Sequence, residues 1–517
     1  MTSQARPRLP HLKDAIAALS LATLLFIWSC FGNLYDVRFG YFSKLPVTTT
    51  ILLAQLCNLL GFAALFWLGA QVLRRHRRRG LDWAACLVIL VVLLAPVEFL
   101  RSVHLGIRDR QVLDFARSWP GLGLAAAMLG GVLWRPRWVM KAVAALLLIS
   151  SPMAFYLLAR TLLLTLQLQF QAPSAGRVGP PPPPLYTHRQ PVRVVWIIFD
   201  ELDERLTFSQ RPPGLALPEL DRFRGEALVA TNAYAPAGCT RVSMPSLIAG
   251  QVFQTAEPSS AQDLRLTVSP TNPPVGFSQL TNVFDEVRAL GGNTAVVGWY
   301  HPYARLLQRS LNFVAWDDCA ADQTRHCATF WGALKDQVGT GLHSVQSRFW
   351  HRQRVADAIG QSLGVVTNAA YALTLLHLPF PHYPAIYDPV QQRLTISMQP
   401  FPQGYFDNLQ LTDRVLGQLR AVMEQSGQWD KTWVLVSADH FWRSAFTYDG
   451  RTDQRVPFLL KAPGHAPGLG CGTVLNTVAT KDLILAILRG QVPDLPAAEI
   501  WLTAHPGTLP DYSTTLN

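Results

Sequence analysis

Two apolar runs of the chain end in side chains that can bind a divalent metal. The run VRVVWIIFDE ends at Asp200 and Glu201, and the run KTWVLVSADH ends at Asp439 and His440. Continuous β-branched and apolar runs of this length are typical of buried strands in a parallel sheet. Carboxylates and an imidazole from separate strands can close on one metal ion. Either pair alone also fits a helix cap or a solvated turn, so the interpretation depends on what lies between them.

A candidate nucleophile lies between the two pairs. Residues 232–251 read NAYAPAGCTRVSMPSLIAGQ, with small and hydroxyl side chains and little charge, and Thr240 stands five residues before Pro245. A threonine hydroxyl is a weak nucleophile, and coordination to a metal lowers its pKa so that an alkoxide forms near neutral pH. The three segments together therefore predict a metal-activated nucleophile.

Alternating strand and helix patterns must position these residues. Further strands are expected at NTAVVGWY, ALTLLHL and VPFLLKAPG, and helices at LPELDRFRGEA, NVFDEVRALGG and FDNLQLTDRVLGQLRAVMEQSG. This alternation predicts an α/β domain with a central, mostly parallel sheet. Ligands of such sheets bind beyond the carboxyl ends of the strands, where both polar pairs stand.

At this point the chain resembles the alkaline-phosphatase superfamily, in particular its sulfatase-like branch. That branch includes membrane phosphoethanolamine transferases and lipoteichoic-acid-synthase-type phosphoglycerol transferases. The shared pattern is an apolar strand ending in acid (IIFDE), a nucleophile about 40 residues later (TRVSMPSLIAG) and a strand ending in Asp-His (SADH). The resemblance covers about residues 192–470 and implies an alkaline-phosphatase-like fold with a divalent metal.

The resemblance also implies roles for individual residues. Asp200, Asp439 and His440 match metal ligands, and Thr240 matches the transferase nucleophile, which also binds the metal. Glu201 matches an acid that is a ligand in true sulfatases but not in the transferases, so its role is open. These ligand types fit Zn²⁺ first and Mn²⁺ as the alternative, and the residue types alone do not separate the two metals.

Histidines outside the Asp-His pair are further candidates. In HLPFPHYPAIYD, His382 matches best a family histidine that approaches the metal or the transferred group, and His377 is ranked below it. A histidine beside proline is as often an ordinary loop residue. His301 in GWYHPY follows an expected strand and is the weakest candidate.

The chain departs from the family pattern at two places. The formylglycine signature of many sulfatases is incomplete because Leu247 stands where arginine is expected and Cys239 has no proline two residues later. Formylglycine chemistry is therefore not expected, with an oxidised Ser243 as the remaining alternative. The transferases usually carry glycine after Asp-His, where this chain has Phe441-Trp442-Arg443, and this leaves the acceptor or leaving-group side open.

The net charge of +11 is confined to the first third of the chain. Residues 1–170 hold 18 Lys/Arg against 6 Asp/Glu, and residues 171–517 hold 27 against 28. The basic residues stand between apolar runs, as in a membrane protein, rather than on a folded soluble face. Nucleic-acid binding is therefore not expected.

Five apolar runs approach the roughly 20 residues needed to cross a bilayer. They are expected at about 14–34, 47–73, 82–100, 118–134 and 139–160. A cleaved signal peptide is the rival interpretation of the first run, but the run is long and four more follow. Residues 161–171 either continue the last helix or lie along the membrane surface.

The loop charges predict the orientation of these spans. Eleven Lys/Arg lie in the amino-terminal tail and in the loops at 74–79 and 135–141, and six lie in the opposite loops. Because positive loops stay in the cytoplasm, the amino terminus is expected inside. The predicted organisation is a five-span helical domain (1–170), a proline-rich linker (171–191) and a periplasmic catalytic domain (192–517), in the inner membrane of a bacterium.

The cysteines agree with an exported second half. Cys319 and Cys327 flank a short polar loop and are expected to form a disulfide in an oxidising compartment, with two free thiols as the alternative. Whether Cys239 and Cys471 pair is left open.

The sequence leads to one principal functional hypothesis and two rivals. The principal one is a membrane-anchored transferase that moves a phosphoethanolamine- or phosphoglycerol-type group from a phospholipid donor to an envelope glycan or lipid acceptor, through a phospho-threonine at Thr240. The first rival is a hydrolase, a phosphodiesterase or sulfatase, that uses the same site with water. The second is a non-catalytic envelope scaffold, prompted by the unusual Phe-Trp after Asp-His.

Overall fold

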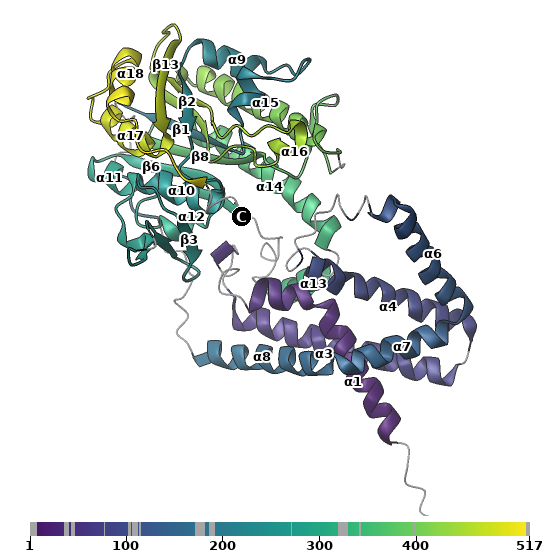
Figure 1. Ribbon diagram of the computed structural model, residues 1–517. Helices are drawn as coiled ribbons and strands as arrows, with labels where there is room; N and C mark the ends of the chain where they lie inside the picture. The colour runs from purple at the N-terminus through teal and green to yellow at the C-terminus, as the bar shows by residue number, and fades with distance from the viewer. Residues whose placement is uncertain are drawn as a thin grey trace, which may run out of the picture. The chain divides into compact units, whose positions relative to one another are not determined.

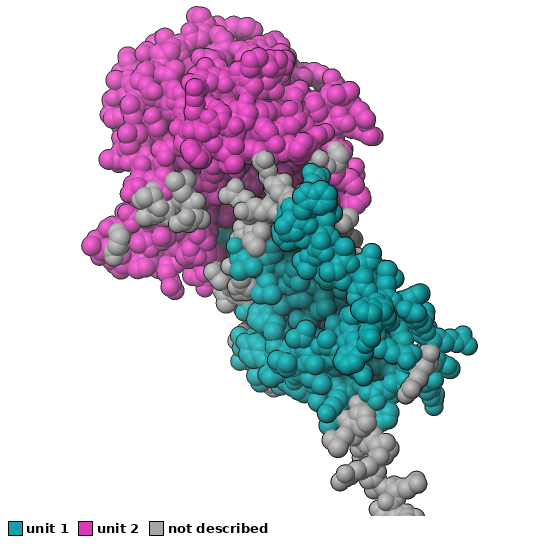
Figure 2. All heavy atoms as spheres, turned by 45° about the vertical axis from the view of Figure 1, so that its right-hand side comes forward, with its two compact units in different colours: residues 1–175, 320–347 teal, residues 176–319, 348–517 magenta. Residues whose placement is uncertain are grey.

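The computed structural model divides into two compact units, coloured separately in Figure 2. Unit 1 comprises residues 1–175 and 320–347, and unit 2 comprises residues 176–319 and 348–517. The structure describes residues 8–35, 41–42, 47–76, 78–101, 105, 112, 115–170, 181–185, 192–269, 271–318, 329–340, 343–396 and 399–512. The chain therefore enters unit 2, returns to unit 1 after residue 319, and re-enters unit 2 after residue 347.

Unit 1 is helical. Its elements are α1 (Arg8–Leu25), the π-helical turn η1 (Trp28–Leu34), α3 (Thr49–Arg75), α4 (Arg79–Phe99), α6 (Trp119–Trp134), α7 (Pro136–Ile149), α8 (Ser151–Phe170) and α13 (Phe330–Thr340). Within the described ranges, three helices are long and apolar enough to cross a membrane: α3, α4 and residues Ser151–Gln169 of α8. The helical, apolar character predicted for this part of the chain is confirmed.

The predicted number of five spans exceeds these three, and the boundaries of the fifth predicted span are wrong. Helix α6 is apolar but has only 16 residues. Where one helix was expected over 139–160, α7 ends at Ile149 and α8 begins at Ser151. Pro152 has no N–H to continue the helical hydrogen bonding, which explains the break. Residues 161–170 continue α8, one of the two alternatives left open by the sequence.

Helix α13 packs against α3 inside unit 1, although it lies between two elements of unit 2 in the sequence. Ala333 of α13 is buried in a core cluster with Leu34, Ile51 and Leu52. Asn58 of α3 donates its amide to the side-chain oxygen of Gln337 at 2.9 Å. Unit 1 thus contains a helix that the amino-terminal sequence alone does not supply.

Unit 2 is built on an eight-stranded sheet (Figure 1). In spatial order its strands are β13 (Leu469–Asn476), β2 (Leu228–Tyr234), β12 (Phe458–Lys461), β11 (Trp433–Ala438), β1 (Val194–Asp200), β8 (Tyr371–Pro381), β6 (Asn293–Tyr300) and β7 (Phe313–Asp318). Only β12 pairs antiparallel with its neighbours. The predicted mostly parallel α/β domain is confirmed, and its sheet places the carboxyl ends of β11, β1, β8 and β6 along one edge.

Helices cover the sheet, so the residues of β1 and β11 are buried throughout, as their apolar runs predicted. Helix α15 (Gln403–Gln425) packs on β8 and against α9 (Pro218–Gly225), which contacts β12. Helix α11 (Val283–Ala289) packs on β6 and against α10 (Thr240–Ala249) and α17 (Thr480–Leu488). The other helices are α12 (Tyr303–Leu306), α14 (His343–Val365), α16 (Ala445–Asp449) and α18 (Leu495–Ala504), with a π-helical turn η3 (Arg205–Ser209). Two small sheets consist of β3 (Thr255–Pro258), β4 (Leu264–Thr267) and β5 (Val275–Gly276), and of β9 (Tyr387–Asp388) and β10 (Arg393–Leu394).

The predicted linker is described only over residues 181–185, and this segment is hydrogen-bonded to other residues of unit 2. The carbonyl of Pro183 accepts a hydrogen bond from Arg288, and the N–H of Leu185 donates to Asn293. The rest of the predicted linker, and the expected disulfide between Cys319 and Cys327, lie outside the described residues.

Candidate metal and nucleophile site

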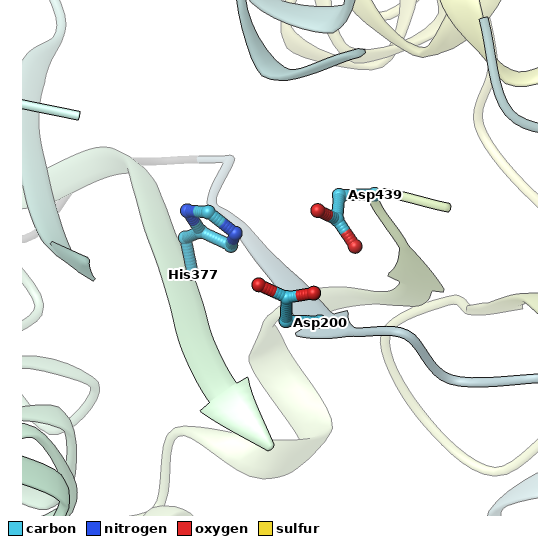
Figure 3. Close-up of side chains that lie close together, drawn as sticks. All are labelled: Asp200, His377 and Asp439. Carbon is cyan, nitrogen blue, oxygen red and sulfur yellow. The ribbon is translucent and has the colours of Figure 1, made fainter. Parts of the chain in front are cut away.

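Three neighbouring strands bring Asp200, Asp439 and His377 together (Figure 3). Asp200 ends β1, Asp439 directly follows β11, and His377 lies in β8 opposite Ile198 of β1. One ligand atom from each residue lies within 4.8 Å of the others, and all three side chains are buried. The sheet therefore assembles two carboxylates and an imidazole at its carboxyl edge.

The unpartnered atoms of these residues fit a divalent cation. Asp200 Oδ1, Asp439 Oδ2 and His377 Nε2 are buried and have no hydrogen-bond partner among the described residues. Each buried polar atom without a partner costs roughly 1–3 kcal/mol. A cation bound between the three atoms would satisfy all of them, and two carboxylates with an imidazole suit Zn²⁺ or Mn²⁺.

Burial sets the charge state of the site. Burial, with the nearby Asp439 and Glu201 carboxylates, raises the pKa of Asp200 well above its ordinary value. Burial lowers the pKa of His377 and of His440 to about 3, so both imidazoles are neutral near pH 7. A bound cation would offset the repulsion between the carboxylates, and neutral imidazoles keep the lone pair that ligation needs.

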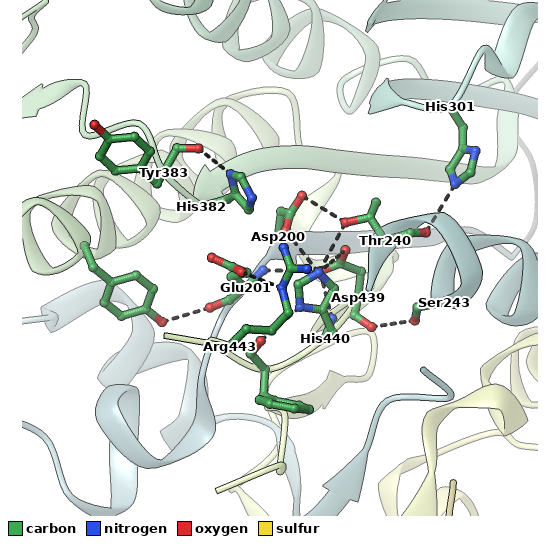
Figure 4. Close-up of polar contacts among 12 residues, drawn as sticks. Asp200, Glu201, Thr240, Ser243, His301, His382, Tyr383, Asp439, His440 and Arg443 are labelled. Carbon is green, nitrogen blue, oxygen red and sulfur yellow. Dashed lines mark hydrogen bonds and ion pairs between the residues drawn. The ribbon is translucent and has the colours of Figure 1, made fainter. Parts of the chain in front are cut away.

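Thr240 lies beside this cluster at the first residue of α10 (Figure 4). Its Oγ1 lies 3.4 Å from Asp200 Oδ2 and 3.3 Å from His440 Nε2. Helix α10 ends at Gly250, whose φ of 71° lies in the left-handed region that glycine adopts most easily. The amino end of a helix carries a partial positive charge, which favours an anion at the hydroxyl of Thr240.

His440 faces the same cluster with its unprotonated nitrogen. Its Nδ1 donates to the carbonyl of Phe441 at 2.9 Å, which leaves the lone pair of Nε2 free. Nε2 lies 3.7 Å from Asp200 Oδ1 and 3.5 Å from Asp439 Oδ2. The structure thus brings together the four residues matched to the family core, Asp200, Thr240, Asp439 and His440, and their roles as ligands and nucleophile stay predictions.

His377 was ranked below His382 from the sequence, and the structure gives it the more central position. The Tyr303 hydroxyl lies 2.7 Å from its Nδ1, which orients the ring so that Nε2 faces the two carboxylates. Tyr303 was not singled out by sequence reasoning. The sequence does contain one signal, Gly298 inside the strand run NTAVVGWY, since a glycine within a strand suggests a close approach of another group. In the structure a Cβ at Gly298 would lie 2.4 Å from the Tyr303 ring.

His382 and His301 lie around the cluster rather than in it. The N–H of His382 donates to the Asp200 carbonyl at 3.1 Å, and its Nδ1 donates to the Tyr383 carbonyl. His301 is buried and its Nε2 donates to the Thr240 carbonyl at 3.2 Å. His301 therefore helps to hold the backbone of Thr240, while the catalytic role of His382 stays a prediction.

Glu201 is fixed next to the cluster but is turned towards an arginine. Its φ of 63° is unusual for a residue other than glycine. Its N–H donates to Asp439 Oδ1 at 3.2 Å, and its carbonyl accepts from the Tyr405 hydroxyl at 2.8 Å. Its Oε1 accepts from Arg443 Nε at 3.2 Å. Metal ligation by Glu201 stays a prediction.

The alternative nucleophiles are placed less favourably. Ser243 is buried, and its hydroxyl donates to the Asp439 carbonyl, which gives it a structural role. Cys239 is the residue before α10, and burial raises the pKa of its thiol. Cys239 and Cys471 are both free, so the pairing left open by the sequence does not form.

The fold and the site define an enzyme with a candidate divalent-metal centre and a candidate hydroxyl nucleophile at the edge of an α/β sheet. The chain belongs to the Sulfatase family, whose family model matches residues 193–489, more than half of its length. The protein is thus a sulfatase-like enzyme, as the resemblance implied.

Solved structures with similar folds are remote in sequence. They include the sulfatase PsFucS1 from Pseudoalteromonas sp. (13% identity, TM-score 0.43, covering 58% of this chain and 68% of that one). Others are a phosphonate monoester hydrolase from Silicibacter pomeroyi (16%, 0.36, 58% and 73%) and a protein in the alkaline phosphatase superfamily from Vibrio parahaemolyticus (14%, 0.38, 62% and 71%). No curated protein matches the chain.

Proposed function

We propose that the protein is a membrane-anchored, metal-dependent transferase. It moves a phosphoethanolamine- or phosphoglycerol-type group from a phospholipid to an envelope glycan or lipid, through a phosphorylated Thr240. The observation that carries this proposal is the position of Thr240 Oγ1, within 3.4 Å of Asp200 Oδ2 and 3.3 Å of His440 Nε2, beside the unpartnered atoms of the metal cluster.

The site residues divide the chemistry between them. Asp200, Asp439 and His377 or His440 would hold the metal, which when bound lowers the pKa of the Thr240 hydroxyl and offsets charge on the phosphoryl oxygens. The hydroxyl proton leaves to Asp200 Oδ2 or His440 Nε2, the two acceptors in reach. The Thr240 oxygen then bonds to phosphorus as the bond from phosphorus to the lipid oxygen breaks, and the leaving oxygen takes up the proton that Thr240 lost. An acceptor hydroxyl later displaces Thr240 in the same way, giving its proton to the Thr240 oxygen.

Three apolar helices support an anchor in the membrane. A site tethered to the bilayer can take a lipid donor without carrying it through water. The bacterial inner membrane, the periplasmic side and the five crossings belong to this proposal, and the loop charges support them.

Hydrolysis by the same site is the second candidate function, because the family is described as Sulfatase. Water would then take the place of the acceptor hydroxyl. Product analysis with and without a glycan or lipid acceptor separates the two functions. The scaffold hypothesis was based on the unusual Phe441 and Trp442, and their burial explains these residues by packing instead.

The first experiment is mass spectrometry of the peptide around Thr240 in protein purified from its native membrane. A head-group phosphate on Thr240, absent from His440→Ala, is expected and would identify the donor group. Thr240→Ala should abolish envelope modification, and Ser243→Ala serves as the matched hydroxyl control on the same helix. An intact modification in correctly folded Thr240→Ala would exclude the proposed mechanism.

A further inference from the structure

The residues after Asp439 and His440 bring an arginine back to the site. Phe441 packs edge-on against Tyr512 with ring centroids 5.3 Å apart. Trp442 stacks on Tyr405 at 3.9 Å with an interplanar angle of 8°. The two aromatic side chains are buried and therefore anchor the turn in which Arg443 stands.

Glu201 fixes one edge of the Arg443 guanidinium. Glu201 is held through both of its backbone polar groups, and its carboxylate accepts from Arg443 Nε at 3.2 Å. An ion pair through Nε leaves the two terminal NH₂ groups as further donors, and the planar fork of arginine suits the oxygens of a tetrahedral anion. The side chain of Arg443 is 37% exposed, so an incoming ligand can reach it.

The Arg443 guanidinium interacts electrostatically with Asp200, whose carboxylate contacts Thr240. Against the larger effect of burial, the positive charge of Arg443 acts to lower the pKa of the Asp200 carboxyl and of the thiol of Cys239, which is the residue before Thr240. Figure 4 shows the Arg443 side chain among Asp200, Glu201 and His440. An ester positioned for attack by Thr240 would therefore contact both the metal site and the Arg443 guanidinium.

We propose that Arg443 is a substrate-binding residue that holds the unesterified oxygens of the group attacked by Thr240, and that the preferred substrate is a monoanionic phosphodiester or sulfate ester. This inference rests on the proposed function. The charge balance gives the preference for a monoanion. With the metal bound, Asp200, Asp439 and Glu201 carry three negative charges, which one divalent cation and Arg443 balance, so no net positive charge remains to attract a dianionic ester.

Binding to a protein that cannot turn over tests the proposal directly. The full chain carrying Thr240→Ala, loaded with metal in detergent, is titrated with methyl p-nitrophenyl phosphate, p-nitrophenyl sulfate and p-nitrophenyl phosphate. We expect the two monoanions to bind more tightly than the dianionic p-nitrophenyl phosphate. Adding Arg443→Gln should weaken monoanion binding about 30-fold or more, because a charged donor pair is lost. Binding within threefold of the Thr240→Ala parent, or no binding by that parent at millimolar ligand, overturns the proposal.

A matched control separates a direct contact from the general positive field. Arg241 is also next to Thr240 and half-buried, but its guanidinium pairs with Glu257 at 3.2 Å. Arg241→Gln should change monoanion affinity only a few-fold. An equal loss in both variants would show that the net charge, and not the Arg443 fork, determines binding.

A second readout follows turnover of methyl p-nitrophenyl phosphate in the chain with Thr240 intact. Arg443→Ala should lose activity and regain part of it when guanidinium ion is added, which a merely structural role would not produce. Failure of rescue together with unchanged binding affinity excludes the proposal. Loss of turnover in Thr240→Ala with full activity in Arg443→Gln would keep the proposed function and exclude this inference. Full turnover in Thr240→Ala would exclude the proposed function and, with it, this inference.

Discussion

At the scale of single residues, the candidate metal ligands depend on groups that do not touch the metal position. His377 Nδ1 lies 2.7 Å from the Tyr303 hydroxyl, while Nε2 faces Asp200 and Asp439. Partners of this kind fix the tautomer and the orientation of a ligating imidazole, and their loss commonly weakens metal binding.

Removal of the Tyr303 hydroxyl should therefore weaken metal binding. For Tyr303→Phe we expect an affinity about 10- to 100-fold lower, measured by competition with a chelator of known affinity. Tyr512→Phe is the control, because its buried hydroxyl donates to the carbonyl of Ala235. Equal affinities for Tyr303→Phe and the unmodified protein would show that the His377 contact has no such role.

A second residue-scale prediction concerns pH and stability away from the site. Burial raises the pKa of Asp413 to about 6, although its Oδ1 accepts from the Leu220 N–H at 2.8 Å. An unfolded aspartate has a pKa near 3.9, so the folded state is penalised progressively as pH rises from about 4 to 6. Asp413→Asn keeps the acceptor and removes the charge. It should raise the unfolding free energy by about 1 kcal/mol at pH 7, and hence the melting temperature by about 2–4 °C.

The same thermal scan at pH 4 provides the internal control for Asp413→Asn. At pH 4 Asp413 is protonated in the folded state and about half protonated in the unfolded state, so most of the difference is lost and the variant and the parent should melt within about a degree of each other. An identical gain at both pH values would mean that the charge of Asp413 is not the cause.

The residues predicted from the sequence are those that stand at the ends of apolar runs. Asp200, Asp439 and His440 could be found because a buried strand ending in polar groups is visible in one local window. The central position of His377 could not be predicted, since the residue lies inside the apolar run of β8 and looks like a core residue. Arg443 was seen only as a departure from the family pattern, because its role depends on packing of Trp442 against a distant tyrosine.

At the scale of elements, strand β6 and helix α12 must approach closely for the site to form. Gly298 of β6 faces the Tyr303 ring of α12, and an added Cβ would lie 2.4 Å from that ring. Real Cβ atoms do not tolerate such a contact, so the ring would have to move away from His377. The close packing of two elements thus determines the geometry of a metal ligand on a third.

Gly298→Ala should consequently weaken metal binding without changing any polar group. We expect a loss comparable to that of Tyr303→Phe, measured by the same chelator competition, together with a lower melting temperature. Gly472→Ala in β13 is the control, because a Cβ there meets nothing within 4 Å. If Gly298→Ala binds metal normally, the position of the Tyr303 ring does not limit the site.

The limits of prediction at this scale are visible in the helices of unit 1. The apolar runs for α3 and α4 were found within a few residues of their bounds, since hydropathy is a property of the local sequence. The break between α7 and α8 was missed, because the apolar composition continues across Ser150 while the hydrogen bonding does not. The apolar composition predicts that the segment is helical and apolar, but the missing N–H of Pro152 determines where the second helix begins.

At the scale of the whole molecule, the position of α13 could not be predicted from any local sequence pattern. The helix belongs to unit 1, yet in the sequence it follows seven strands of unit 2, β1 to β7. Asn58 donates to Gln337 and to the carbonyl of Leu334, and Gln337 donates to the carbonyl of Ile51. Such a long-range polar contact in an apolar cluster leaves no local pattern.

The side chains of Asn58 and Gln337 should be energetically coupled. Asn58→Leu and Gln337→Leu should each lower the melting temperature, because each leaves a partner unsatisfied among apolar side chains. The double variant should lose less than the sum of the two single losses, by about 0.5 kcal/mol or more. Additive losses measured by thermal unfolding in detergent would show that the two amides do not interact.

The position of α13 on α3 also makes a prediction about topology. The contact lies near the amino end of α3, at Ile51 and Asn58, while Arg74 near its carboxyl end pairs with Asp14 of α1. If the basic loop at 74–79 is cytoplasmic, α13 lies at the exported end of α3. Trp331→Cys, at an exposed position of α13, should then react with a membrane-impermeant maleimide added to cells with a permeabilised outer membrane, above the wild-type background. His76→Cys should react only after the inner membrane is opened, and the reverse labelling would invert the proposed orientation, because both ends of α3 must change sides together.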